Sequence, residues 1–189
     1  MTSVFCKRFL PAYGDRTIDQ MIQAARSGKQ NIIEGTEDGM TSTEMELKLI
    51  NVARSSLQEL RADYEDYIKS HQLQLWKNTH PRYAPLFEHC RSHNEYSDYE
   101  PFVYRWTDEE FCNTAVTLLH ITDRMMSRYH EFLQKTFVEQ GGIKERMYAA
   151  RTGYRRQQDE LLKRLQQDNA ILKAENDRLR KELARMTGR

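Results

Sequence analysis

Apolar residues recur along most of this chain at intervals of three and four positions, the repeat of a helix face, and almost nowhere at the alternating interval of a strand. The first such stretch predicts a helix over residues 15–34, which follows the turn "AYGD" and precedes Gly35, a residue placed to end it. Its apolar face comprises Ile18, Met21, Ile22, Ala25 and Ile32. The pattern indicates an all-α protein.

Two further long helices are each preceded by a capping box, in which a Thr hydroxyl and a Glu carboxylate satisfy N–H groups at the helix start. Thr41 with Glu44 starts a helix that reaches about residue 70, and its apolar face comprises Met45, Leu49, Val52, Ser56, Leu60 and Tyr67. Thr107 with Glu110 starts another, which ends at Gly141 and Gly142; its face comprises Phe111, Ala115, Leu118, Thr122, Met125, Tyr129 and Phe132. Residues 72–106 form a Pro- and aromatic-rich connection, with a short helix expected near 83–93.

Each long helix has one apolar face of the width that a bundle interior requires. We therefore expect an up-down antiparallel helical bundle over residues 1–140, whose first helix is short. The hydrophobic content of 39% is enough for one such core and not for two.

From residue 143 onward a helical pattern continues without a break to residue 186, and its last part has a heptad repeat. We divide this region into a basic connecting helix, 141–160, and a leucine zipper, 161–189. The d positions are Leu165, Leu172, Leu179 and Met186, and the a positions are Leu162, Asn169, Asn176 and Leu183. The alternative is a single helix packed on its own body.

Charges beside the heptad repeat favour a parallel arrangement of two chains. In parallel chains Asp168 pairs with Lys173 of the other copy, and Glu175 pairs with Arg180, whereas antiparallel chains bring like charges together. An Asn at an a position is tolerated best where it meets its own copy across the zipper, as in an in-register parallel dimer.

Composition adds limits on location and partners. Residues 140–189 hold 13 Lys and Arg against 7 Asp and Glu, a net charge of +6, so the rest of the chain is acidic. Cys6, Cys90 and Cys112 are widely spaced thiols without a CxxC motif or a secretory leader before them, which indicates a reduced, cytoplasmic protein. No apolar run approaches the roughly 20 residues of a membrane span.

The segment "QMIQAARSGKQNIIEG" (20–35), followed by "TEMELKLINVARSSLQELRADYEDY", resembles the four-helix-bundle family encoded in intervening sequences of bacterial large-subunit ribosomal RNA genes. The later segments "WKNTHPRYAPL", "CNTAVTLL" and "EQGGIKERM" are similar to the variant called four-helix-bundle suffix proteins. In this chain the first helix of that bundle is reduced to a stripe of Val4, Phe5, Phe9 and Leu10.

A relative in this family is the accessory variability determinant of diversity-generating retroelements, a homopentamer that binds a reverse transcriptase and RNA. The resemblance implies a small non-enzymatic oligomer with a nucleic-acid partner. It also marks Asn31, Glu34 and Gly35 as family motif residues. From the residues themselves we expect a structural role, in which Asn31 and Glu34 bond free backbone groups at a helix end and Gly35 permits positive φ.

The stretch "KERMYAARTGYRRQQ" lies just before the zipper and resembles, loosely, the basic region of a basic-region zipper. Its cations can contact phosphates without reading bases, and the alternative is a basic face that docks on the acidic body or lies in solvent. The candidate nucleic-acid-binding residues are Lys144, Arg146, Arg151, Arg155 and Arg156.

Two alternatives would place a chemical site on this chain, a ribonuclease pair and a zinc site. Arg124 and His130 fit the loose Arg-x(4–6)-His pattern of ribonucleases built on another all-α bundle, but six positions turn about 240° around a helix. His89, Cys90 and His93 could offer zinc ligands, although three loosely spaced ligands are a weak pattern.

The sequence therefore predicts a non-catalytic homo-oligomeric adaptor without cofactor or metal. It would be a dimer or a pentamer that binds RNA or DNA, a reverse transcriptase-type partner, or both. A ribonuclease and a purely architectural oligomer are the alternatives.

Overall fold

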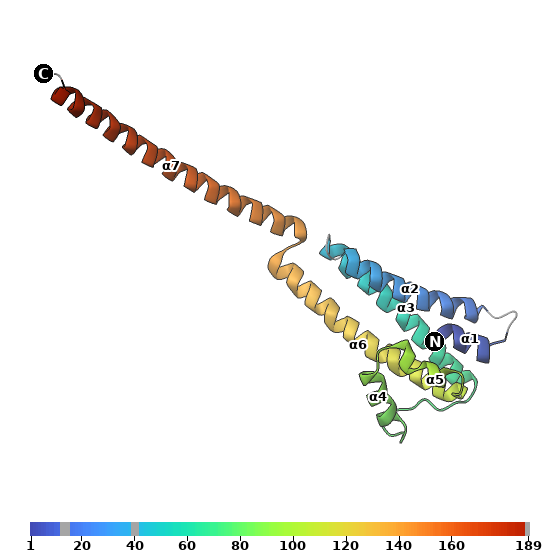
Figure 1. Ribbon diagram of the computed structural model, residues 1–189. Helices are drawn as coiled ribbons and strands as arrows, with labels where there is room; N and C mark the ends of the chain where they lie inside the picture. Colours follow the sequence, from blue (N-terminus) through green and yellow to red (C-terminus); the bar gives the residue numbers. More distant parts are fainter. Residues whose placement is uncertain (12–15, 39–41, 188–189) are drawn as a thin grey trace. The chain divides into compact units, whose positions relative to one another are not determined.

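The described residues, 1–11, 16–38 and 42–187 of a computed structural model, form helices joined by turns and contain no strand (Figure 1). The chain divides into two compact units, the body (Met1–Gln140) and the tail (Gly141–Arg189). The helices are α1 (Thr2–Phe9), α2 (Thr17–Asp38), α3 (Thr43–Ser70), α4 (Tyr83–Ser92), η1 (Tyr96–Asp98), α5 (Glu100–Val103), α6 (Asp108–Gln140) and α7 (Ile143–Thr187). The predicted all-α class and the long C-terminal helix are confirmed.

Within the body, α3 packs between α2 on one side and α6 on the other, and runs antiparallel to both. The Tyr129 hydroxyl near the end of α6 donates a hydrogen bond to Glu46 near the start of α3. At the opposite end, the hydroxyl of Tyr67 lies 3.5 Å from a carboxylate oxygen of Asp108. Contacts that pair the start of one helix with the end of the other define the antiparallel direction.

Gly35 does not end α2, which continues to Asp38, so the predicted helix stop was wrong. A Cβ added at Gly35 would lie 3.2 Å from Cβ of Leu49, and one added at Gly28 would lie 2.6 Å from Cδ2 of Leu57. Both glycines therefore serve close approach between α2 and α3. The rule that places glycine after a helix does not consider this tertiary constraint.

The predicted apolar face of α3 is buried in its second half, at Ser56, Leu60 and Tyr67, but its first half differs from the buried one. Met45 and Val52 are 44% and 42% exposed, whereas Ile50, Ala53 and Tyr64 are almost fully buried. In this first half the buried positions differ from the predicted ones because α3 packs against both α2 and α6. The predicted face assumed that the helix is buried on one side only.

The predicted apolar face of α6 is buried at its start and exposed toward its end. Phe111 and Ala115 are 0% and 6% exposed, but Met125 and Phe132 are 66% and 62% exposed. The prediction that the whole face lies in the core was wrong for this second part. Among the described residues of the body, no helix covers it.

Phe5 of α1 is fully buried and anchors the main core of the body. Its ring centroid lies 4.9 Å from that of Tyr64 and 5.4 Å from that of Phe111, so it joins α3 to α6. Three residues further on, Arg8 donates a hydrogen bond to the carbonyl oxygen of Trp106 at 2.8 Å. The few residues of α1 thus hold one end of the body together.

The capping box before α6 is confirmed. The Glu110 N–H donates to Thr107 Oγ1 at 3.2 Å, and the Thr107 N–H donates to a carboxylate oxygen of Glu110 at 3.1 Å. The other predicted box includes Thr41, which lies outside the described residues. At the start of α3 the side chain of Ser42 accepts a hydrogen bond from the Met45 N–H at 3.3 Å.

A glycine pair separates α6 from α7, as predicted. Gly141 has φ of +70°, which glycine adopts readily and other residues rarely do. The Gly142 N–H then donates to the side chain of Glu145 at the start of α7. A single helix of 45 residues runs through the predicted connecting segment and most of the predicted zipper. In residues 1–11, 16–38 and 42–187 no helix is long and apolar enough to cross a bilayer.

We predict that Phe5→Ala lowers the free energy of unfolding of the body by about 3–5 kcal/mol, because it removes a fully buried ring from a close-packed aromatic cluster. Urea unfolding followed by tryptophan fluorescence measures this loss. Both tryptophans, Trp76 and Trp106, belong to the body, so the tail does not contribute to the signal.

Tyr104, which is 66% exposed, provides the matched control. Tyr104→Ala should change the free energy of unfolding by no more than about 0.5 kcal/mol. A loss below about 1 kcal/mol for Phe5→Ala would mean that α1 does not belong to the core.

Candidate assembly seam and nucleic-acid interface

The eight heptad positions predicted on α7 lie on one face of a continuous helix, and we call them the seam. They are Leu162, Leu165, Asn169, Leu172, Asn176, Leu179, Leu183 and Met186. In the single chain the leucines of the seam are about half exposed or more, from 50% at Leu165 to 64% at Leu183. Burying a leucine side chain contributes roughly 1.5–3 kcal/mol relative to leaving it in water. The seam is therefore a long apolar face without cover within its own unit.

Two amides interrupt the seam. Asn169 and Asn176 are both exposed, and Asn176 Nδ2 donates to the carbonyl oxygen of Leu172 at a long 3.3 Å. This bond lies within the helix and leaves Asn176 Oδ1 available as an acceptor. Opposite a second copy, an Asn at an a position can bond its own counterpart.

The charges beside the seam are largely free within the chain. Arg178 forms an i,i+4 ion pair with Glu182 at 3.3 Å, but both side chains are more than half exposed, so it contributes about 0.3–0.5 kcal/mol. Among the ion pairs of the described residues, none engages Lys173, Glu175 or Arg180. These charges remain available for a second chain.

From residue 161 onward, two exposed large apolar side chains of the described part of α7 lie outside the seam. Ile171 is 64% exposed at a c position, and Leu161 is 51% exposed at a g position. The heptad pattern gives these two residues no role. Ile171 neighbours Leu172 in the chain and is similarly exposed, which makes it a direct comparison for any test of the seam.

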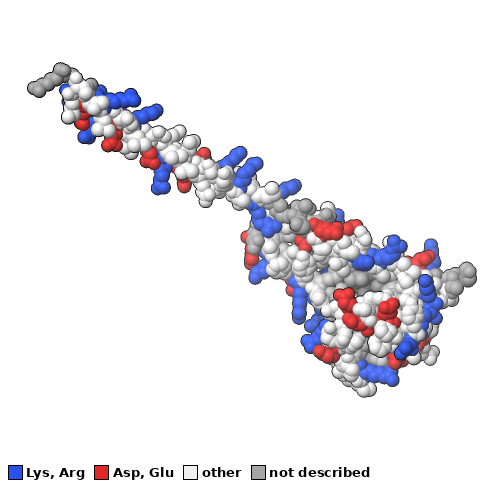
Figure 2. All heavy atoms as spheres, in the orientation of Figure 1, with Lys and Arg blue, Asp and Glu red and all other residues white. Residues whose placement is uncertain are grey.

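The five predicted phosphate-contacting residues, which we call the basic root, are all exposed on the first part of α7. Figure 2 shows Lys and Arg side chains, in blue, along this helix. They are Lys144, Arg146, Arg151, Arg155 and Arg156. None takes part in an ion pair among the described residues. Exposed aromatic rings, Tyr148 (65%) and Tyr154 (62%), lie among these cations. Free cations interleaved with aromatic rings suit the phosphates and bases of a nucleic acid.

Within the basic root, the a and d positions of the heptad repeat are no longer occupied by leucine. Continued backward from Leu162, the repeat places Tyr148, Arg151, Arg155 and Gln158 on the line of the seam. An Arg at such a position would face its own copy and repel it. The apolar seam therefore begins at Leu162, and the basic root lies outside it.

The family motif residues of α2 are inside the helix, not at its end as expected. Asn31 Nδ2 donates to the Ser27 carbonyl oxygen at 2.9 Å, one turn earlier. Glu34 accepts a hydrogen bond from Gln30 Nε2 at 2.8 Å. Together with the close contact of Gly35 on α3, these bonds serve α2 itself and its packing. The structural role is retained, but the proposed helix-end geometry was wrong.

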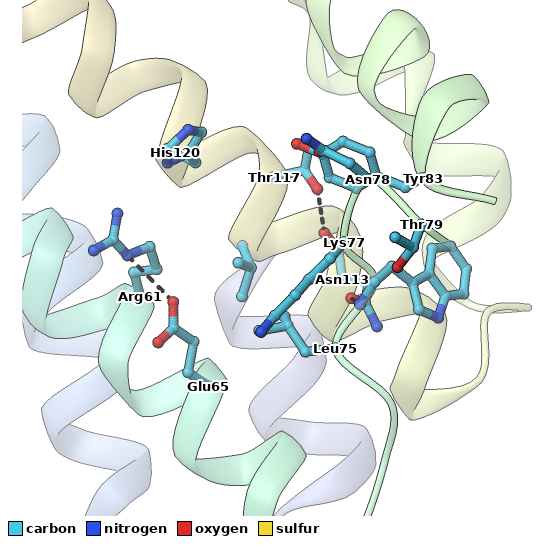
Figure 3. Close-up of a pocket in the computed structure, with 12 residues that line it drawn as sticks. Arg61, Glu65, Leu75, Lys77, Asn78, Thr79, Tyr83, Asn113, Thr117 and His120 are labelled. Carbon is cyan, nitrogen blue, oxygen red and sulfur yellow. Dashed lines mark hydrogen bonds and ion pairs between the residues drawn. The ribbon is translucent and has the colours of Figure 1, made fainter. Parts of the chain in front are cut away.

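The body has a cleft of about 620 Å³ between α3, α6 and the segment that precedes α4 (Figure 3). No motif in the sequence predicts this cleft. Arg61 and Glu65 form an ion pair on its α3 side at 3.4 Å, and His120 lies on its α6 side. Its floor includes Asn113, which is 2% exposed.

Most polar groups at the floor of this cleft are already bonded. Asn113 Nδ2 donates to the carbonyl oxygens of Gln74 and Glu109, both at 2.9 Å, and Asn113 Oδ1 accepts the Trp76 N–H at 2.7 Å. Trp76 Nε1 donates to the Glu109 carboxylate at 2.9 Å, which lowers the pKa of Glu109 below its ordinary value. These bonds fix the segment to α6, so we interpret the cleft floor as a structural anchor.

The structure does not bring the proposed ribonuclease pair together. Arg124 and His130 lie six residues apart on the continuous helix α6, which separates their side chains by about 240° of rotation. Arg124 is exposed and His130 is half-buried, and no hydrogen bond between them is present. A shared active site would need a distortion of α6.

The candidate zinc ligands are engaged in other contacts. The rings of His89 and His93 stack on each other with centroids 4.1 Å apart, and Cys90 is 2% exposed. The Tyr99 hydroxyl donates to the His93 carbonyl oxygen at 2.8 Å. In the described part of the chain, no group of three or more His, Cys, Asp or Glu side chains is placed to hold a metal ion.

Comparison of the chain with protein-family models, with curated proteins and with solved structures finds no match.

We predict that Asn113→Ala lowers the free energy of unfolding of the body by about 1–3 kcal/mol, because it leaves the buried Trp76 N–H and the Gln74 carbonyl without their partner. Urea unfolding with tryptophan fluorescence detects the change. The exposed Asn78 lines the same cleft, and Asn78→Ala should leave stability unchanged. Equal effects of the two substitutions would contradict the anchoring role of Asn113.

Proposed function

We propose that this chain is a non-catalytic homo-oligomeric adaptor whose seam joins two copies in a parallel coiled coil. The observation that carries the proposal is the seam itself, a regular apolar face left open on a 45-residue helix. A single helix gains little from exposed leucines, whereas two such helices bury them against each other.

Parallel pairing of two strands is supported by the residues in and beside the seam. Asn169 and Asn176 meet their own copies in an in-register parallel dimer, and the free charges of Lys173, Glu175 and Arg180 then find opposite charges across the interface. The family resemblance supports a pentamer instead. A two-stranded seam does not close a five-fold ring evenly, so the two arrangements exclude each other.

The basic root gives this oligomer a surface for RNA or DNA. Its five cations are exposed, none forms an ion pair among the described residues, and dimerisation would present them twice. Binding through two copies raises avidity without new contacts in either copy. Because no base-reading Asn is present in the basic root, we propose contact with phosphates and no sequence preference.

The proposal also covers the arrangement of the body and its protein partner. We propose that it is an up-down antiparallel four-helix bundle in which α1 is the shortened first helix. By resemblance to the four-helix-bundle family, its partner would be a nucleic-acid-associated protein of the reverse transcriptase type, in the cytoplasm. A purely architectural oligomer would share the seam and lack the nucleic-acid contact. A ribonuclease is less well supported, because Arg124 and His130 lie on different faces of α6.

Leu172→Lys should convert the full chain from a dimer to a monomer, because it places a charge at the centre of the seam. Light scattering at matched protein concentration measures the change as a halving of mass. Ile171→Lys is the control: it introduces the same charge one residue away, at a side chain of similar exposure, and should leave the mass of the dimer unchanged.

Two outcomes would contradict the seam as the assembly device. If the unmodified chain has the mass of one copy, the seam does not assemble it. If Leu172→Lys leaves a pentamer intact, contacts of the body set the assembly, as the family resemblance implies.

Replacing Arg151, Arg155 and Arg156 by Gln should weaken binding to a labelled DNA duplex and reduce its salt dependence. Each lost phosphate contact lowers the slope of log affinity against log salt by about 0.9. Fluorescence anisotropy over a series of salt concentrations gives this slope, and a single-stranded RNA provides the second ligand.

A second triple variant removes the same charge elsewhere on α7. Arg178, Lys181 and Arg185 lie off the seam near the end of the helix, and their replacement by Gln should leave the slope unchanged. An equal loss in both variants would mean that net charge alone attracts the nucleic acid. Absence of binding in the unmodified chain would favour the architectural alternative.

A further inference from the structure

The second part of α6 carries an uncovered apolar surface, which we call the α6 face. It consists of Met125, Tyr129 and Phe132, which are 66%, 38% and 62% exposed. Their spacing of four and three residues places them on one side of the helix. This spacing continues the buried positions Phe111 and Ala115, so the α6 face is the open part of a longer apolar stripe.

The covered part of the stripe indicates what kind of element fits the open part. Phe5 and Phe9 of α1 pack on Phe111, with ring centroids 5.4 and 6.1 Å apart. A short helix therefore covers the beginning of the stripe, and α1 ends at Phe9. An amphipathic helix is the element that matches apolar positions repeating every three and four residues.

Buried neighbours on α6 and a hydrogen bond to α3 fix the α6 face to the body. Met126 and Leu133, on the adjacent side of α6, are 7% and 6% exposed. The hydroxyl of Tyr129 donates a hydrogen bond to Glu46 of α3, which is itself 7% exposed. This bond raises the pKa of Tyr129 to about 12. A surface fixed in this way loses little conformational freedom on binding.

Cations border the α6 face along one edge. Arg124, Arg128 and Lys135 are exposed at positions four and seven residues apart, in a row that also contains two carboxylates, Glu131 and Glu139. Lys135 makes a loose, exposed ion pair with Glu139 at 3.8 Å. Among the described ion pairs, none includes Arg124 or Arg128. The edge of the face is therefore basic, although the body as a whole carries a net negative charge.

A similar combination of apolar and basic side chains occurs on α2. Ile32 of α2 packs against the small core that contains Ile50 and Ala53 of α3 and Met126 of α6. The next residue, Ile33, is 39% exposed, and it lines a surface hollow together with Arg26 and Lys29. Exposed apolar side chains bordered by cations thus occur on both helices.

We propose that the α6 face docks an amphipathic helix with acidic flanks that belongs to a protein other than this chain. A second copy offers the same basic edge, and isologous contact of two such faces would bring like charges together. The proposal deepens the adaptor role by giving the chemistry of the protein partner. It does not depend on the number of strands in the seam.

The test uses the full chain and two labelled helical peptides of about 21 residues, or six turns. Both carry Leu at the a and d positions, and the flanking positions hold Glu in one peptide and Lys in the other. Fluorescence anisotropy should show the Glu peptide binding about fivefold or more tightly than the Lys peptide. Equal affinity of the two peptides, or no binding of either, overturns the proposal.

Variants of the α6 face locate the binding. Phe132→Asp should weaken binding of the Glu peptide about tenfold or more, because it removes an apolar anchor. Tyr104→Asp alters a similarly exposed aromatic residue elsewhere in the body and should have no effect. Joint replacement of Arg124 and Arg128 by Glu should shift the preference toward the Lys peptide. Retained preference for the Glu peptide would contradict the role of the basic edge.

Mass measurements on the same variants separate this proposal from the function proposed above. Leu172→Lys should change the mass of the chain and leave peptide binding intact. Phe132→Asp should reduce peptide binding and leave the mass intact. A fall in mass with Phe132→Asp would assign the α6 face to a second copy and overturn the proposal.

Discussion

In the body, Phe5 of the eight-residue helix α1 is fully buried, with its ring centroid 4.9 Å from that of Tyr64 and 5.4 Å from that of Phe111. This contact joins α3 to α6 at the end where the main core lies. A helix of eight residues is about 12 Å long, whereas the 33 residues of α6 extend about 50 Å. α1 therefore covers only the first part of α6 and leaves the face that contains Met125 and Phe132 open.

The same requirement, that apolar helix faces be shielded from water, acts separately on the tail. There no described residue of the tail covers the seam, and from the heptad spacing with Asn169 and Asn176 we propose another copy as the cover. The α6 face lacks such polar positions and has a basic edge, which indicates a different protein. Two open surfaces with different chemistry fit an adaptor, which holds its own copy with one surface and a partner with another.

Local rules predicted much of this fold from the sequence. The capping box of Thr107 with Glu110, the end of α6 at Gly141 and the continuous helix that follows depend on neighbouring residues, and all three predictions are confirmed. Local rules failed where tertiary packing determines whether a helix continues or a side chain is buried. Gly35 was predicted to end a helix because the close approach of α2 to α3 cannot be seen in the sequence. Met125 was predicted to be buried because an apolar helix face does not show whether a neighbouring helix is long enough to cover it. The seam and the basic root could be predicted from the sequence because they depend only on the spacing and charge of residues along one helix, and their roles remain proposals.

The most direct test of the account is disulfide formation by Leu183→Cys in the full chain under mild oxidation. The native thiols, Cys6, Cys90 and Cys112, are buried in the body and should not compete. In a parallel, in-register seam the new thiol meets its own copy, so a covalent dimer should form at low protein concentration, while Ile171→Cys should form little. In an antiparallel seam the two copies of residue 183 lie roughly 27 Å apart. A chain that stays monomeric on a non-reducing gel would contradict the parallel coiled coil.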